Sequence, residues 1–253
     1  MAIVTATVTN AAEPAEGRLA QAFDGDTIAV HVDGEDLRLR LHAIDAPDQE
    51  QDLYFEAGAA LRELLQGKPL RVELVAKTFR QQPAVILVDG TDINGEMIRA
   101  GYAYAHRKYL GLSAFDSRYC ALEHEARAAG RGLWALEPQD RIAPWQLRQS
   151  YRGNRSAFTD FSDETVADCE AAAGRSNIQG DTRAGTIVAD PIPGLTPPDP
   201  ACRIKADITF SGKRRYHVPG MRTYAGIIIN EEKGERWFCS ESEAENAGWA
   251  RGR

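Results

Sequence analysis

The sequence has no long apolar stretch and no recognisable export signal. No apolar run approaches the roughly 20 residues of a membrane-spanning helix, so no membrane span is expected. Residues 1–10 alternate Ala, Val and Thr without a basic start or an apolar centre, so no signal peptide is visible. A removed leader would leave the same sequence, and the protein would then be secreted or periplasmic, so localisation stays open.

Cysteine is scarce and net positive charge is absent. The four cysteines lie far apart without a Cys-x-x-Cys pair, which argues against a zinc ribbon or finger. Their even number permits disulfides, and buried free thiols are the alternative. The net charge of −7 argues against a broad nucleic-acid-binding surface but allows a basic cluster beside one cleft.

What is present is sufficient for a folded core, because 43% of the 253 residues are hydrophobic. Short extended runs fill residues 18–44, with Asp-Gly turns between them, and Leu37, Leu39 and Leu41 alternate with polar residues. Further along, the patterns predict these elements: helices over 54–65, 94–100 (with Asn94 as N-cap) and 116–129, and strands over 70–74, 84–88 and 102–105.

This order of elements predicts an α+β, mainly β fold. We expect a five-stranded OB-like barrel with about three flanking helices in residues 1–147. Residues 148–200 are acidic and end in a Pro-rich stretch, so we expect a linker, with a short helix allowed over 163–173. Residues 201–253 are expected to form a small separate α/β module with a capped helix after Ser240.

Two short motifs carry the chemistry. Asp24-Gly25-Asp26-Thr27 and the segment from Arg40 to Asp48 place carboxylates and a guanidinium at the ends of neighbouring predicted strands. Such a group can hold a hard cation beside a phosphate. The alternatives are a turn residue for Asp26, a cap for Asp45, and a surface arginine paired with either for Arg40.

The first 145 or so residues resemble the thermonuclease family, the staphylococcal-nuclease-like domains. The resemblance rests on an ordered set of segments: Asp24-Gly25-Asp26-Thr27, Arg40 followed by Asp45-Ala46-Pro47, Asp89-Gly90 with Ile93-Asn94, Met97 to Gly101, and Glu125 to Trp134. It implies an OB-like barrel and calcium-dependent cleavage of DNA or RNA phosphodiesters.

The same resemblance implies residue roles. Asp26 and Asp45 would bind calcium, with the carbonyl of Ala46 as a further oxygen ligand, and Arg40 would clamp the phosphate. Calcium suits such a site because it takes six to eight oxygens in irregular geometry. Apart from the resemblance, Lys108 and Tyr109 follow a predicted strand and lie in a loop, which makes them candidates to contact the substrate.

Two positions depart from the family pattern. Asp48 stands where the family usually has Glu, so its carboxylate falls short by about 1.3–1.5 Å. It could act through an extra water, Glu50 could replace it, or it could have no role. The family's second arginine is also displaced: the segment 77–83 lacks Tyr-Gly-Arg, and Arg80 is the nearest candidate.

The C-terminal residues resemble a small module found on some bacterial nucleases and surface proteins. A disulfide between Cys202 and Cys239 would stabilise so small a core. A metal site made of His217 and cysteine is an alternative. The cluster Lys213-Arg214-Arg215-Tyr216 would grip nucleic acid or form a solvated charged turn.

The sequence therefore predicts a bacterial calcium-dependent nuclease with a DNA or RNA substrate, acting as a monomer without an evident protein partner. Asp48 and the altered 77–83 loop are reasons to expect weakened activity. The alternative is a degenerate OB-barrel module that binds nucleic acid or nucleotide without turnover. A third hypothesis is a cell-envelope interaction protein with the barrel as scaffold.

Overall fold

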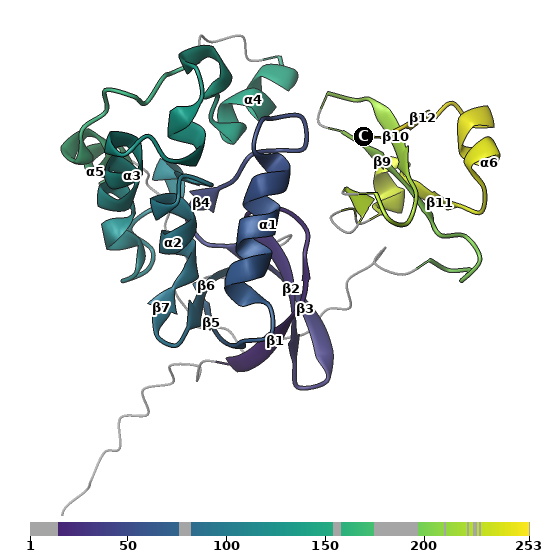
Figure 1. The fold of residues 1–253 in the computed structure, drawn as a ribbon, viewed down its shortest axis with the longest axis horizontal. Coiled ribbons are helices and arrows are strands. Elements are labelled where there is room, and N and C mark those ends of the chain that lie inside the picture. The colour runs from purple at the N-terminus through teal and green to yellow at the C-terminus, as the bar shows by residue number, and fades with distance from the viewer. Residues whose placement is uncertain are drawn as a thin grey trace, which may run out of the picture.

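The computed structural model describes residues 15–75, 82–153, 158–174, 197–209, 211–221, 223–224, 227 and 229–252. The strands are β1 (Ala15–Ala22), β2 (Thr27–Val32), β3 (Glu35–Leu41), β4 (Ile44–Asp45), β5 (Pro69–Leu74), β6 (Gln82–Val88), β7 (Thr91–Asp92), β8 (Tyr104–Ala105), β9 (Ile204–Ile208), β10 (Arg214–His217), β11 (Arg236–Phe238) and β12 (Ala250–Arg251). The α-helices are α1 (Tyr54–Leu65), α2 (Ile93–Arg99), α3 (Tyr119–Ala128), α4 (Pro144–Tyr151), α5 (Val166–Gly174) and α6 (Glu241–Asn246). Figure 1 shows β1 to α5 in one region and β9 to β12 with α6 in another.

Strands β1, β2, β3, β6 and β5 form a closed mixed barrel. Antiparallel pairings join β1 to β2, β2 to β3, β1 to β5 and β5 to β6, and a parallel pairing of β3 with β6 closes the ring. As the alternation predicts, Leu37, Leu39 and Leu41 are buried inside it. The predicted OB-like barrel, mainly β with flanking helices and a separate C-terminal sheet, is confirmed.

Helix α2 corrects one local prediction. The N-cap is Asp92, whose Oδ1 accepts a hydrogen bond from the Gly95 N–H at 3.1 Å. Asn94 is fully buried instead, and it bonds the backbone of three surrounding residues: His42 O, Ala84 O and Ile86 N. A buried amide that satisfies three backbone groups contributes more than a cap on the surface would.

The predicted helix over 116–129 is shorter than expected. A 3₁₀ turn spans Asp116–Arg118, and α3 begins only at Tyr119. The buried Asp116 carboxylate accepts hydrogen bonds from the N–H groups of 111, 112 and 113 and lies 2.8 Å from Nε2 of His42. These bonds explain why the first turn departs from α-helical geometry.

Two helices lie in or overlap the segment expected to be a linker. Helix α4 runs across residue 148, and α5 packs on α3, to which the Cys120–Cys169 disulfide joins it. Ahead of α5, the Arg127 guanidinium donates to the carbonyl oxygens of Phe161 and Glu164. The short helix allowed over 163–173 is thus present as α5, and these contacts hold it against α3.

The C-terminal module is a four-stranded sheet in the order β11-β9-β10-β12, with α6 beside it. Tyr216, Phe238 and Trp249 are among the side chains of its core. The Ser240 hydroxyl caps α6 by accepting from the Glu243 N–H at 3.2 Å, as the capping pattern predicts. Throughout the described ranges, every helix is too short or too polar to span a bilayer.

Candidate active site

The barrel brings Asp26 and Arg40 together where β2 begins and β3 ends. Thr27 pairs with Arg40 in the β2–β3 ladder, and the Leu41 N–H donates to the Asp26 carbonyl at 2.7 Å. The side chains of residues at or next to such a backbone pairing lie within contact distance of one another. Residues 14 positions apart in the chain thus become neighbours.

The turn before β2 is fixed by its own residues. Oδ1 of Asp24 accepts from the N–H groups of Asp26 at 2.9 Å and Thr27 at 2.6 Å, an Asx-type turn. A Cβ at Gly25 would lie 2.7 Å from the Cβ atoms of both Ala46 and Ala57, so only glycine fits there. The Asp24-Gly25-Asp26-Thr27 motif is thus a packing requirement as well as a chemical one.

Asp26 and Asp45 converge on one guanidinium nitrogen. Nη2 of Arg40 donates to Asp26 Oδ2 at 2.8 Å and to Asp45 Oδ1 at 2.7 Å. The two carboxylates are almost fully buried, at 2% and 0% exposure. The remaining bonds to Asp26 come from the Thr27 hydroxyl at 2.9 Å and the Ala46 N–H at 3.0 Å.

Helix α4 supplies a second guanidinium to this cluster. Nη1 of Arg148 donates to both Asp48 oxygens, at 3.0 and 2.9 Å, and its Nη2 donates to Asp45 Oδ2 at 2.5 Å. Gln51 connects the two segments, because its Oε1 accepts from the Asp48 N–H and its Nε2 donates to the Ile142 carbonyl. Asp45 therefore lies between two arginines, one on each oxygen.

Burial dominates the electrostatics of the cluster. It raises the pKa of Asp48 to about 7 against the opposing effect of Arg148, and it raises the pKa of Asp45 against both arginines. Burial and the neighbouring Asp26 raise the pKa of Asp24 to about 7. Burial alone would lower the pKa of Arg40, but the carboxylates outweigh it and raise that pKa. Crowded, buried carboxylates of this kind are stabilised by added positive charge.

Sequence reasoning missed Arg148 and looked to Arg80 for a second arginine. Arg80 lies outside the described residues. Arg148 follows Pro144, which occupies the first turn of α4, so the sequence contained a helix-start signal at this point. No periodicity links it to Asp45, which is 103 residues away.

Lys108 and Tyr109 lie in a 3₁₀ turn beside a row of aromatic rings. The Tyr109 ring contacts His106 at 4.6 Å between centroids, and His106 stacks on Trp145 of α4 at 4.7 Å. The Lys108 ammonium lies 5.4 Å from the centre of the Tyr109 ring. Burial, then the positive charges of Arg148 and Arg40, lower the pKa of His106 to about 3.

The other candidates lie apart from this cluster. The structure joins Cys202 to Cys239 by a disulfide, so neither thiol is available to form a metal site with His217. Nδ1 of His217 bonds the Thr223 hydroxyl at 2.6 Å instead. The Cys120–Cys169 disulfide was not predicted as a pair, and it leaves no cysteine free.

The donors near Arg40 suit a hard cation better than a transition metal. Asp26 and Asp45 present carboxylate oxygens to the same Arg40 nitrogen, so both already face one cationic group. In the described ranges no three His, Cys, Asp or Glu side chains are grouped as a protein-only metal cage. Calcium and magnesium take oxygen ligands and keep bound water, so they suit a site of two carboxylates and a carbonyl oxygen. Zinc usually binds His nitrogen and Cys sulfur, so it suits this site less well.

Known proteins and one family model are similar to the barrel region of this chain. The family model described as "Staphylococcal nuclease homologue" matches residues 38–136. A protein of Escherichia coli O157:H7 named "Uncharacterized endonuclease" is 34% identical over 134 residues, covering 52% of this chain and 84% of that protein. A protein of Shigella flexneri named "Micrococcal nuclease" is 32% identical over 144 residues, covering 53% and 80%. The "Protein ParB" of Escherichia coli is 30% identical over 153 residues, covering 55% and 82%.

Proposed function

This chain belongs to the staphylococcal nuclease family, and from that premise we propose that it hydrolyses DNA or RNA phosphodiesters at the Arg40–Asp45–Arg148 cluster, with calcium as cofactor. Membership makes it a nuclease that acts on nucleic acids. The observation that carries the proposal is the convergence of two guanidiniums on one buried carboxylate.

The two arginines would bind the scissile phosphate. A guanidinium offers parallel N–H donors to two phosphate oxygens, and its charge offsets the negative charge that grows in the pentacoordinate transition state. Arg40 contacts Asp26 and Asp45 through Nη2, which leaves other N–H groups of its fork for the phosphate. Arg148 approaches the same carboxylate from α4, so a phosphate there would meet both.

Asp48 would position the attacking water and accept its proton. The water oxygen forms the new bond to phosphorus, the bond from phosphorus to the leaving oxygen breaks, and that oxygen takes a proton from solvent. Arg148 holds both Asp48 oxygens, which fixes the direction of this shorter carboxylate. That constraint supports a working role for Asp48 without the extra methylene of Glu.

Calcium would be held by the carboxylates of Asp26 and Asp45 and by the carbonyl oxygen of Ala46. When bound, it supplies positive charge beside the phosphate and a coordination position that a phosphate oxygen can take. The chain's own contribution is to keep those carboxylates ionised and oriented, which Arg40 supports through one nitrogen. Lys108 and Tyr109 would contact the base and sugar of the substrate.

The test is cleavage of single-stranded DNA by the full chain in calcium and in chelator, beside Asp26→Ala. We expect cleavage in calcium, loss in chelator, and a loss of at least a hundredfold in Asp26→Ala. Activity indifferent to both changes would refute the proposal.

One observation favours a second candidate, a module that binds nucleic acid without turnover. Both Asp48 oxygens are engaged by Arg148, so the base is occupied as the structure stands. In that case a labelled oligonucleotide would bind in calcium and remain intact over hours, with Asp48→Asn binding equally well.

A further inference from the structure

A second arginine of β3 lies beside Arg40 on the outside of the barrel. Leu37, Leu39 and Leu41 of this strand are buried in the barrel core, so the alternate residues Arg38 and Arg40 face outward. A strand rises about 3.3 Å per residue, which places their Cα atoms about 6.6 Å apart. Arg38 is thus one step along the strand from the arginine that the proposed function assigns to the scissile phosphate.

The Arg38 guanidinium is held over an aromatic ring. Its Cζ atom lies 5.2 Å from the centre of the Phe23 ring. Ala22 belongs to the barrel core, and the Phe23 N–H donates to the Thr27 carbonyl at 2.9 Å, so Phe23 continues the line of β1 and faces outward. Because β2 lies between β1 and β3, the Arg38 side chain crosses β2 to reach this ring. Thr27 is also the cross-strand partner of Arg40, so the Arg38 guanidinium reaches the level of Arg40 on the sheet.

The residues of β2 that Arg38 crosses are small and uncharged. Its cross-strand partner is Ala29, and the next residue of β2 on the outer face is Thr27. Ala29 has only a methyl group, so a long side chain can lie across the strand at this point. Small residues at 27 and 29 therefore leave room for the arginine that Phe23 holds.

The N–H donors of the Arg38 guanidinium remain available for an anionic ligand. Arg38 is exposed, and among the residues that the structure describes none of the side-chain hydrogen bonds or ion pairs includes it. Arg40 differs, because Asp26 and Asp45 accept from its Nη2. A cation–π contact uses the charge of a guanidinium rather than its N–H donors. Phe23 therefore orients the Arg38 cation without satisfying its donors, which suits a site for phosphate.

We propose that Arg38 binds the phosphate next to the scissile phosphate, at a subsite on the outer face of β1, β2 and β3. The inference rests on the proposed function, because it extends the same substrate beyond Arg40. Neighbouring phosphates of a single strand are one nucleotide apart, so two guanidiniums on one face of a sheet can each bind one of them. The contact is made with the backbone of the nucleic acid, so affinity should depend on a second phosphate and not on the base.

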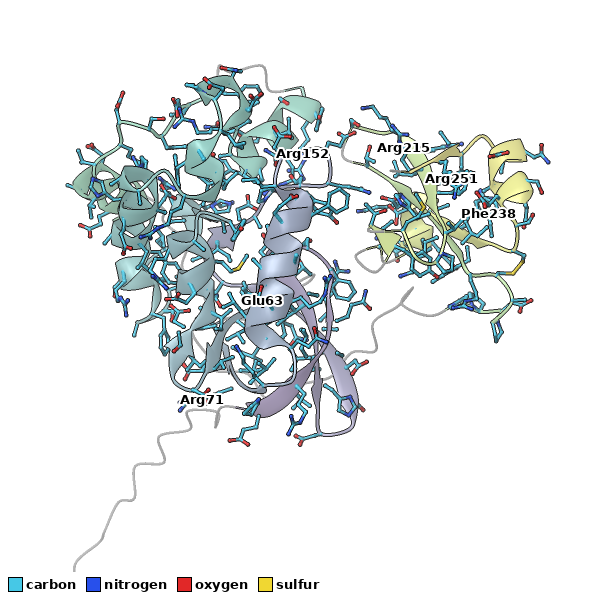
Figure 2. The ribbon with its side chains drawn as sticks, viewed as in Figure 1. Glu63, Arg71, Arg152, Arg215, Phe238 and Arg251 are labelled. Atoms are coloured by element: carbon cyan, nitrogen blue, oxygen red, sulfur yellow. A yellow bond between two sulfur atoms is a disulfide. The ribbon has the colours of Figure 1, made fainter. Side chains whose placement is uncertain are left out.

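The first test measures binding, in chelator so that no turnover occurs. A fluorescein-labelled single strand of 16 thymidines is titrated by anisotropy with full-length wild type, Arg38→Ala, Arg38→Lys and Phe23→Leu at several salt concentrations. Arg62→Ala is the matched control, because it removes one positive charge from an exposed position on α1, where Figure 2 labels the next residue, Glu63. Thermal unfolding verifies that each variant is folded.

We expect Arg38→Ala to bind this strand about tenfold more weakly than wild type at 50 mM salt. The slope of log affinity against log salt concentration should become shallower by about 0.7, which corresponds to one lost phosphate contact on a single strand. Arg38→Lys should keep the wild-type slope, because it keeps the charge, and Phe23→Leu should weaken binding about threefold by releasing the guanidinium. Arg62→Ala should match wild type.

The second test measures cleavage in calcium of the thymidine dinucleotide and trinucleotide, which carry one and two phosphates. Arg38→Ala should lower kcat/KM for the trinucleotide about tenfold, through KM, and leave kcat/KM for the dinucleotide unchanged. A loss of folded protein would instead affect both substrates equally.

Wild-type affinity and salt slope in Arg38→Ala would overturn the subsite. An equal loss of affinity in Arg62→Ala, or an equal loss of kcat/KM on both short substrates, would overturn it as well. Failure of wild type to cleave any substrate would refute the proposed function alone, because the binding test does not depend on turnover. The two failures are therefore distinguishable.

Discussion

Replacing Arg148 by alanine perturbs the site at the residue that sequence reasoning did not anticipate. Its side chain is 16% exposed and makes three hydrogen bonds to two carboxylates, Asp45 at 0% and Asp48 at 16% exposure. Arg148→Ala removes both hydrogen bonds that fix Asp48 and one of the two arginines on Asp45. Arg40 remains in place, so the cluster keeps one guanidinium.

The expected losses follow from these contacts. Removing one charged donor to a transition state typically costs about 10²–10³ in kcat, and we expect a loss of that size. Breaking a fully buried ion pair costs about 3–5 kcal/mol of unfolding free energy, and partial solvent access here reduces the expectation to about 2 kcal/mol. Arg148→Lys should recover stability more than kcat, because lysine keeps the charge but cannot hold two oxygens in a fork.

The assay pairs kcat on single-stranded DNA in calcium with the free energy of unfolding from urea titration. Arg62→Ala, at an exposed position on α1, is the control and should change neither quantity. Free guanidinium ion added to the Arg148→Ala variant should restore part of kcat. A purely structural role for Arg148 would give no such rescue. Wild-type kcat in Arg148→Ala would refute the assignment of this arginine to the site.

Three further predictions concern stability. Folding lowers the pKa of His106 from 6.5 to about 3. Between these two pH values the unfolded chain binds a proton that the folded chain excludes, so the free energy of unfolding falls as the pH drops. At pH 5 the loss is about 2 kcal/mol. His106→Gln should flatten that slope in urea titrations at pH 7 and 5. Asn94→Ala leaves three buried backbone groups without their partner and should cost about 3 kcal/mol, whereas a loss below 1 kcal/mol would show that they find other partners. Replacing Cys120 and Cys169 by alanine removes a disulfide between residues 49 positions apart and should lower the free energy of unfolding by roughly 4 kcal/mol. The measurement is unfolding without reductant, and an unchanged free energy would contradict a stabilising role for this disulfide.

Sequence periodicity predicted the elements whose formation depends on which face of the segment is buried. The alternation of Leu37, Leu39 and Leu41 corresponds to the inner face of β3, and the helical spacing over 54–65 corresponds to α1. A period of two or of 3.6 residues records which face is buried, and burial decides these elements. The ordered motifs then identified the family.

Prediction failed where two good local choices compete or where distant segments pair. Asp92 and Asn94 are both suitable N-caps, and only the buried carbonyls around Asn94 decide between them. Arg148 reaches Asp45, and Cys120 reaches Cys169, through tertiary packing that no periodicity encodes. Such contacts depend on how α4 and α5 fold back on the barrel.

The most direct test of the account is the initial rate of single-stranded DNA cleavage as free calcium is raised from chelated to saturating levels. Wild type and Asp45→Asn are measured side by side, with folding of both verified by thermal unfolding. We predict a saturable calcium dependence in wild type and a rate at least a hundredfold lower in Asp45→Asn at every calcium concentration. Equal rates in the two proteins, or cleavage by wild type that persists in chelator, would contradict the assignment of catalysis to this cluster.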